Sequence, residues 1–134
     1  EAIKEIAQKL RELDDSLHSF LKDFQPVNEP NLEEKISASI KIHNEFVNSY
    51  KKHKIFFSKT TADLMHKIAL SSRDTYHEVQ TYPVSLDDSD YKFIPRLLSD
   101  RDESWKRARQ SFNQDMQQLM DELEATFRQI LGIE

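Results

Sequence analysis

Two Asp-x-x-His pairs, Asp63 with His66 and Asp74 with His77, come closest in this chain to a metal-binding pattern. Side chains three positions apart on a helix share a face, so each pair offers two ligands to one ion. Di-iron bundles, however, use Glu-x-x-His pairs on two helices that face one another. Both pairs here fall on one expected helix, about 16 Å apart at 1.5 Å per residue. They cannot share an ion, and we expect no metal and no other cofactor.

Other patterns that could carry chemistry are incomplete. An acidic run from Asp87 to Asp90 resembles the start of a calcium loop, but Lys92 and Phe93 stand where further oxygen ligands and a Gly are required. The chain has no Cys, no Gly-x-Ser-x-Gly elbow and no glycine-rich phosphate loop. With one Gly, backbone amides can form an oxyanion hole only at a helix start. We therefore expect no catalytic residues and a protein that is not an enzyme.

The remaining candidates are a histidine and a lysine cluster. His43 lies on an apolar stripe between Ile40 and Val47. A polar residue at such a position fixes register or partner choice at a cost in stability, and we interpret His43 in this way. A ligand or a pH switch is the alternative. The lysines (Lys51, Lys52, Lys54 and Lys59) are interpreted as a solvated stretch paired with the acidic last helix, and a phosphate, a lipid headgroup or an acidic partner is the alternative.

The elements that would position these residues are helices. The first segment alternates three- and four-residue spacing between apolar residues, as the a and d positions of a coiled coil do. These residues are Ile3, Ile6, Leu10, Leu13, Leu17, Phe20 and Phe24. We expect this helix to end near Phe24, because Pro26 and Pro30 flank a polar turn.

From Asn31, an N-cap residue, to Tyr82 the chain has neither Gly nor Pro. Its apolar stripe is Ile36, Ile40, His43, Val47, Tyr50, Lys54, Phe57, Thr61, Leu64 and Ile68, and a second line is Leu32, Ser39, Ile42, Phe46, His53 and Phe56. The pattern predicts a continuous or gently kinked helix to about Gln80, roughly 75 Å long. A break near Ser58 and Thr61 is the alternative, because polar and β-branched residues weaken helix propensity there.

Residues 82–100 are expected to connect this helix to the last one, which should begin near Ser99 or Asp100 and end at a C-cap, Gly132. The last helix repeats the same spacing with Trp105, Ala108, Phe112, Met116, Leu119, Leu123, Phe127 and Ile130.

Composition agrees with a helical protein. The chain has 134 residues, which indicates one domain over 1–134, with 37% hydrophobic and 32% charged residues. One Gly and four Pro exclude all-β folds, which need a turn about every 8–12 residues. A net charge of −5 and a pI near 5.6 argue against nucleic-acid binding. No apolar run approaches the roughly 18 residues of a membrane span. Glu1 falls inside a pattern already under way, so we expect a fragment of a longer chain.

The expected architecture is all-α: an elongated antiparallel bundle of three long helices, or four if the central helix breaks near Ser58 and Thr61. The first helix would pack antiparallel to the first half of the long helix, and the last helix would return along the second half. Parts of such a bundle would be only two helices thick. Their exposed apolar surface favours a protein partner or a homo-oligomer.

Three segments carry a family resemblance: residues 46–58, Glu103-Ser-Trp105 and Phe127-Arg-Gln-Ile-Leu-Gly132. They resemble a broad group of bacterial proteins that have an N-terminal membrane segment, a charged coiled coil and a C-terminal helical domain. The resemblance covers nearly the whole chain but rests on packing motifs. It implies a cytoplasmic helical module, tethered to the membrane face through an upstream segment, and it implies no reaction.

The function expected from these observations is protein–protein interaction or self-association within a larger coiled-coil protein. The residues expected to form the interaction seam are Ile3, Leu10, Leu17, His43, Tyr50 and Phe57. The alternative is a ligand- or signal-sensing bundle, in which residues 82–100, with the sequence Phe93-Ile-Pro-Arg96, close over one end as a lid.

Overall fold

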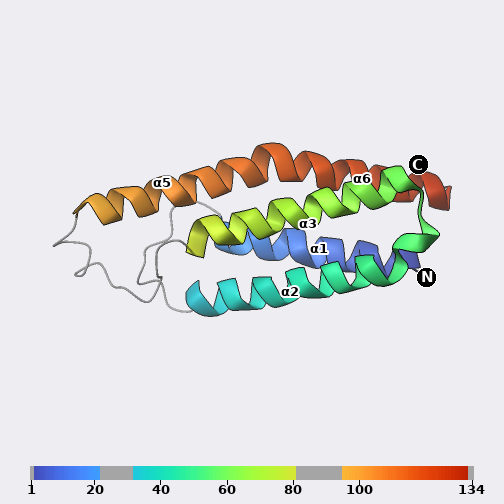
Figure 1. Cartoon of the computed structure of the whole chain (residues 1–134), viewed down its shortest axis with the longest axis horizontal. Coiled ribbons are helices and arrows are strands. Elements are labelled where there is room, and N and C mark those ends of the chain that lie inside the picture. Colours follow the sequence, from blue (N-terminus) through green and yellow to red (C-terminus); the bar gives the residue numbers. More distant parts are fainter. Residues whose placement is uncertain (1, 22–31, 81–94, 133–134) are drawn as a thin grey trace.

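The computed structural model describes residues 2–21, 32–80 and 95–132, and within these ranges the chain is helical with no strand. Figure 1 shows the helices lying side by side, each antiparallel to the next along the chain except α5 and α6, which continue one another through η2. The elements are α1 (Ala2–Leu21), α2 (Leu32–His53), the 3-10 turn η1 (Lys54–Phe56), α3 (Lys59–Gln80), α5 (Pro95–Ser111), the π-helical turn η2 (Phe112–Met116) and α6 (Gln117–Leu131). The predicted all-α antiparallel bundle is confirmed in its four-helix form.

The prediction of a continuous central helix is wrong. The α-helix ends at His53, one 3-10 turn follows, and Phe57 is extended with φ −116° and ψ 156°. Ser58 then caps α3: its Oγ accepts a hydrogen bond from the Thr61 N–H at 3.2 Å, and its carbonyl accepts one from the Ala62 N–H at 2.9 Å. The break therefore comes just before Ser58, slightly earlier than the alternative placed it.

Two physical effects favour the break in the absence of Gly or Pro. The basic residues Lys51, Lys52 and His53 occupy the last turn of α2, where cations interact favourably with the helix dipole. Folding α3 back along α2 also lets both halves bury their apolar faces in one core, so that Phe46 and Met65 are both 0% exposed. Burying side chains of this size contributes about 1.5–3 kcal/mol each.

Because α3 folds back, α1, α2, α3 and α6 lie side by side in place of the predicted zones of only two helices. The start of α5 extends past the ends of the other described helices (Figure 1). α1 packs against α2 on one side and faces α6 on the other, and α3 packs against α2, α5 and α6. The alternating spacing predicted for α1 is confirmed in its burial from Ile6 to Leu17. The buried positions on α1 are Ile6, Leu10, Leu13, Leu17 and Leu21.

The last helix begins at Pro95 and not near Ser99 or Asp100, so the predicted start is four or five residues too late. Proline suits the first turn of a helix, because its missing N–H would have no partner there. At the other end Gly132 adopts φ 72°, and its N–H contacts the carbonyls of Arg128 and Gln129. The predicted C-cap is confirmed, and a positive φ is the conformation for which glycine is preferred.

The π-helical turn η2 follows from the spacing of the buried residues. Ser104, Ala108, Phe112, Met116 and Met120 are all buried and recur every four residues. In an α-helix each such step drifts about 40° around the axis, because four residues exceed the 3.6-residue turn. The wider π turn at Phe112–Met116 absorbs this drift. It keeps the two halves of the helix facing the same core.

Three expectations fall partly or wholly outside the described residues. They are the extension of the first helix to Phe24, the acidic run at Asp87–Asp90, and the lid at residues 82–100, of which residues 95–100 lie on α5. The second helix does begin where predicted, at Leu32, directly after Asn31.

Candidate interaction site

A groove runs along the open edge of the bundle, between α1 and α6. Its volume is about 420 Å³. The apolar part of its lining is Ile3, Ala7, Leu10, Met120, Phe127 and Leu131, and the polar part is Lys4, Arg11, Asp14, Gln117, Asp121, Glu124 and Arg128. Leu131 is 51% exposed, so the groove opens to an apolar rim at the end of α6. This edge is where α1 and α6, the first and last helices of the bundle, face one another.

The two walls of this groove carry different charges. The α1 wall carries two cations and one carboxylate, Lys4, Arg11 and Asp14, whereas the α6 wall carries two carboxylates and one cation, Asp121, Glu124 and Arg128. Lys4 and Arg11 form no ion pair within the described ranges, whereas Glu124 pairs with Arg128 one turn away, with Nη2 and Oε1 3.2 Å apart. The α1 wall therefore has unpaired positive charge for an incoming surface to meet.

Asp14 lies at the inner end of the groove in an unfavourable environment for a carboxylate. Its Oδ1 atom is shielded from solvent and accepts no hydrogen bond from the described residues. His18 Nε2 lies 3.4 Å away, too far for a good hydrogen bond and an ionic contact only when the ring is protonated. Burial raises the pKa of the Asp14 carboxyl; His18 opposes this shift, and three nearby carboxylates add to it, those of Asp15, Asp121 and Glu124.

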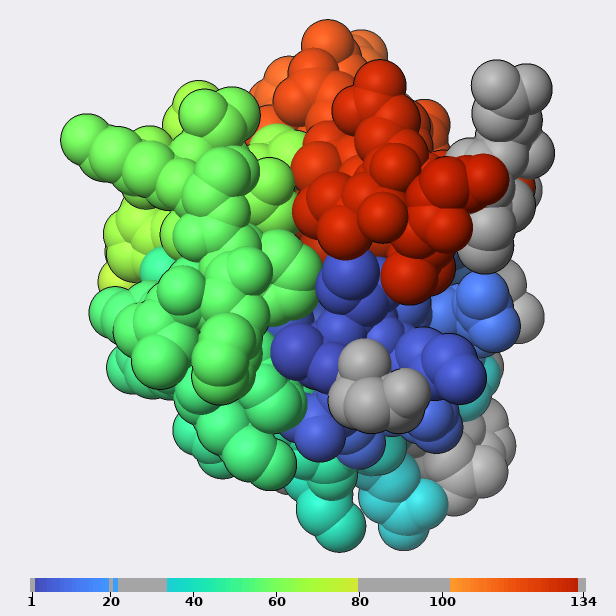
Figure 2. Space-filling view, turned by 90° about the vertical axis from the view of Figure 1, so that its right-hand side faces the viewer, coloured from blue at the N-terminus to red at the C-terminus, as the bar shows by residue number. Residues whose placement is uncertain are grey.

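A second exposed apolar region covers the end of the bundle where α1 begins. Figure 2 looks onto this end, where the start of α1 (blue), the α2–α3 connection (green) and the end of α6 (red) lie side by side. The large apolar residues exposed among the described ones all lie here: Ile55 (79%), Phe56 (72%), Ile130 (54%) and Leu131 (51%). An open depression of about 550 Å³ lies between them, lined by Ala2, Ile3, Phe56, Phe57, Ser58, Thr61, Thr126 and Ile130.

The six predicted seam residues are divided between these surfaces and the core. Ile3 and Leu10 line the α1–α6 groove. Phe57 lines the end depression, and its ring centroid lies 5.9 Å from that of Phe127. Leu17 is 0% exposed and Tyr50 is 8% exposed, both within the core of this chain. Contact of any of them with another chain stays a prediction.

The sixth, His43, is half-buried and has partners inside the chain. Its Nδ1 lies 2.6 Å from the Ser72 Oγ, and its ring packs edge-on against Tyr76 at 5.5 Å between centroids. Ser72 also donates to the Ala69 carbonyl. Burial, and to a smaller extent the positive charge of Arg73, lowers the pKa of His43. The hydrogen bond joins α2 to α3 and fixes the orientation of the ring.

Hydroxyl groups in the core are the feature that apolar spacing did not predict. The buried polar residues are Ser39, Ser49, Thr61, Ser72, Thr75 and Ser104. Several of them connect helices: Ser39 bonds both Ser16 and Tyr76, and Ser104 donates to the Glu78 carbonyl. A small polar residue at a core-facing position was the available signal, because a buried hydroxyl needs a partner.

The four lysines are exposed, but among the described residues none of them pairs with the last helix, so that part of the interpretation is wrong. Lys52 instead lies 3.8 Å from Glu5 on α1. Glu5 also accepts a hydrogen bond from the Ser49 hydroxyl at 2.5 Å and contacts His53 Nε2 at 3.1 Å. The hydrogen bond from Ser49, together with the two cations, lowers the pKa of Glu5 although burial opposes the shift. The network joins α1 to the end of α2.

The Asp-x-x-His pairs lie on exposed positions of α3. Asp63, His66 and Asp74 are exposed, and Asp74 contacts Arg73 at 3.5 Å. The His66 ring packs 6.4 Å from that of Tyr50. Within the part of the chain that is described, no three His, Cys, Asp or Glu residues are grouped so as to hold a metal ion.

Among the described helices, none is both long enough and apolar enough to cross a membrane. A comparison with known proteins gives no assignment: no family model, no curated protein and no solved structure matches this chain.

Proposed function

We propose that this chain is a non-catalytic helical interaction module that self-associates through the α1–α6 groove. One observation carries the proposal: an open apolar groove lies along one edge of a bundle whose other edges are packed. The wider setting, a larger membrane-tethered coiled-coil protein, rests on the family resemblance alone.

The charges of the groove walls favour a second copy of this chain as the occupant. A two-fold axis parallel to the helices would place α1 of one copy over α6 of the other. Lys4 and Arg11 of each copy would then face the wall of its partner that carries Asp121 and Glu124. Complementary potentials of this kind favour one register and speed association. Arg128 already pairs with Glu124, so we expect Asp121 to be the stronger partner for Arg11.

The apolar area that such a dimer would bury is modest. The most exposed apolar residue of the groove is Leu131, while Leu10 and Met120 are only 7% and 3% exposed. Stable specific interfaces bury about 800 Å² on each partner. A dimer formed through the groove would therefore need its rim as well, and we expect association that depends on concentration.

The test is the mass in solution, measured by light scattering over a wide concentration range, with a pair of arginine substitutions. Ala7→Arg fills the groove, because Ala7 is half-buried and lines it. Ala125→Arg places the same side chain at an exposed position of α6 that does not line the groove. We expect the wild type and A125R to dimerise alike and A7R to remain a monomer. Leu10 is avoided, because replacing a buried core residue would unfold the bundle.

A charge exchange sharpens the test. Arg11→Glu should weaken the dimer, and Asp121→Arg in the same chain should restore part of the lost affinity if the two residues meet across the interface. A wild-type chain that stays monomeric at every concentration would overturn self-association. So would a dimer that A7R leaves unchanged.

A ligand-sensing function is the second candidate, and the groove volume supports it. Pockets for small molecules are typically about 300–1,000 Å³, and this groove holds about 420 Å³. A ligand would raise the melting temperature without changing the mass, and A7R would abolish that rise. A thermal-shift screen of metals, anions and apolar small molecules distinguishes the two functions.

A further inference from the structure

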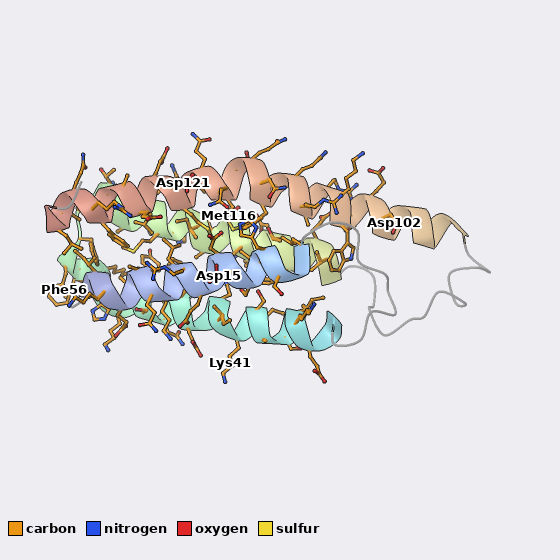
Figure 3. All side chains as sticks on the ribbon, turned by 180° about the vertical axis from the view of Figure 1, so that it is seen from behind. Asp15, Lys41, Phe56, Asp102, Met116 and Asp121 are labelled. Atoms are coloured by element: carbon orange, nitrogen blue, oxygen red, sulfur yellow. The ribbon has the colours of Figure 1, made fainter. Side chains whose placement is uncertain are left out.

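The 3-10 turn η1 presents two large apolar side chains to solvent. Ile55 is 79% exposed and Phe56 is 72% exposed, and η1 has no buried residue. The next residue, Phe57, instead turns inward against Phe127. Figure 3 shows Phe56 at the end of the bundle where α6 also ends, here called the tip. Apart from a ring contact between Phe56 and His53, whose centroids lie 6.3 Å apart, the packing of the described chain does not account for an aromatic and a branched aliphatic residue at these two positions.

Lysines surround this tip. Lys51 and Lys52 precede η1, Lys54 is its first residue, and Lys59 begins α3, and all four are exposed. Residues 46–62 contain no Asp, no Glu and no Arg, in a chain whose net charge is −5. Lys52 contacts Glu5 on the neighbouring helix. The other three lysines form no ion pair with any described residue, so the tip carries a local positive charge.

We propose that this tip docks on an anionic lipid surface, with Ile55 and Phe56 inserted at the boundary of headgroups and acyl chains and the lysines against the headgroups. Exposed apolar side chains with nearby lysines are the combination by which peripheral segments bind membranes. Each lysine near an anionic surface adds attraction that salt screens. The long lysine side chains can lie along apolar surface while their ammonium groups reach the headgroups.

Two features favour lipid over a protein partner at this tip. Protein interfaces are enriched in arginine and depleted in lysine. Here two large apolar residues are exposed at the end of the bundle, and the basic residues around them, His53 apart, are all lysines. Exposed apolar side chains at such an end fit a fluid surface that closes around them. The proposal concerns η1 and is independent of the α1–α6 groove.

The first experiment places a fluorescent reporter at the tip. Phe56→Trp is made in a Trp105→Phe background, so that the indole at position 56 is the single one in the chain. The protein is mixed with vesicles of phosphatidylcholine alone, or of phosphatidylcholine with phosphatidylserine. We expect a blue shift of the emission and cosedimentation with the anionic vesicles only, both reversed by high salt. No shift and no sedimentation with either vesicle would overturn the proposal, as would equal binding to both.

Matched variants then separate insertion from charge. Ile55→Ser with Phe56→Ser should abolish sedimentation while circular dichroism and the melting temperature stay unchanged, because both side chains are exposed. Lys51→Glu with Lys54→Glu should weaken binding by about tenfold or more. The control variant, Lys41→Glu with Lys67→Glu, changes the net charge by the same amount at exposed positions away from the tip. Figure 3 shows Lys41 pointing away from the bundle. This control should bind nearly as the wild type does.

Three results would overturn the lipid proposal: unchanged binding of the serine variant, equal loss in both charge variants, or a wild type that ignores vesicles but forms dimers that the serine substitutions abolish. The last would identify the tip as a protein contact. A7R distinguishes failure here from failure of the groove proposal, since it should bind anionic vesicles as the wild type does.

Discussion

The Tyr76 hydroxyl lies 2.5 Å from the Ser39 Oγ and donates to the Ser39 carbonyl at 3.0 Å. Ser39 Oγ in turn lies 2.8 Å from Ser16 Oγ. These residues belong to α3, α2 and α1, and Ser39 is 0% exposed while Tyr76 is 3% exposed. A chain of hydroxyls thus connects three of the four helices through the core. Polar groups that are paired in this way specify one arrangement of the helices, because any shift would leave a buried hydroxyl without a partner.

Replacing Tyr76 by Phe should lower the free energy of unfolding by about 1–2 kcal/mol, because the tyrosine hydroxyl and its bonds to Ser39 are lost. Tyr50→Phe is the matched control: Tyr50 is also buried, but its hydroxyl makes no hydrogen bond with the described residues, so the loss should be near zero. Urea denaturation at neutral pH measures both. Equal losses in the two variants would contradict a specific role for the hydroxyl chain.

Alkaline pH should destabilise the protein through the same residue. Burial raises the pKa of Tyr76 from 10.0 to about 12. Because the folded pKa exceeds the unfolded one, the stabilisation is fully present below pH 10 and is lost as the pH rises towards 12. In Y76F this loss should be smaller. Unfolding free energies measured across that pH range, with Y50F alongside, test the prediction; parallel curves for Y76F and wild type would refute it.

Asp14→Asn should stabilise the protein at neutral pH. Burial raises the pKa of Asp14, so the folded state favours the neutral carboxyl, and that stabilisation is lost as the pH rises through the folded pKa. The amide is neutral at every pH. We expect a higher urea midpoint for D14N at neutral pH and a difference that shrinks towards about pH 3, where the carboxyl is itself protonated. Asp15→Asn, at an exposed position, is the control and should change little. A stability loss in D14N at neutral pH would show that the carboxylate has a favourable partner.

Ser58→Ala should lower the free energy of unfolding by about 1 kcal/mol, because the Thr61 N–H loses its capping oxygen. Ser58→Gly should cost less, a few tenths of a kcal/mol, since glycine tolerates the cap position. Ser37→Ala, at an exposed interior position of α2, serves as the control and should be neutral or slightly stabilising. Thermal or urea denaturation gives the order of stability of the three variants. A break that did not depend on the Ser58 cap would give S58A and S37A the same stability.

Deleting Gln114 from the π turn should be tolerated. Removing one residue from a π turn restores α-helical spacing, so residues on both sides keep their faces towards the core. Deleting Glu122 is the control, because it is also exposed but lies in regular α-helix. That deletion would rotate Leu123 and Phe127 by about 100°, out of the core, at a cost of several kcal/mol. Circular dichroism and melting temperature distinguish them; equal damage from both deletions would contradict the account of η2.

Apolar spacing predicted the helices well and their ends less well. The alternation along α1 depends on a single face meeting the core, and its buried residues are those predicted from Ile6 to Leu17. The next buried residue, Leu21, was not on the predicted stripe. The prediction of one continuous central helix failed because apolar spacing does not indicate where a chain turns back when Gly and Pro are absent. After the break the helical phase starts again. Met65 is therefore 0% exposed although the predicted stripe ran through Leu64, and Phe56, predicted on an apolar line, is exposed.

The candidate surfaces were predictable only in part. Ile3 and Leu10 were expected to meet another chain, and both line the α1–α6 groove. The groove itself depends on the distance between two helices that lie far apart in sequence, which local spacing does not contain. The lysine cluster was visible in the sequence, and one of its alternatives was a lipid headgroup. The structure favours that alternative, because η1 exposes Ile55 and Phe56 to solvent beside the lysines.

The order of the helices has a consequence for how the chain folds. Three of the four neighbouring pairs, α1 with α2, α2 with α3, and α3 with α5 and α6, are consecutive in sequence. Each can form as a helical hairpin by closing a loop much shorter than the separation of α1 and α6. The α1–α6 edge is different, because it closes only when the first and last helices meet. We expect this edge to form last on the folding pathway and to open first in native-state hydrogen exchange, ahead of the α1–α2 hairpin.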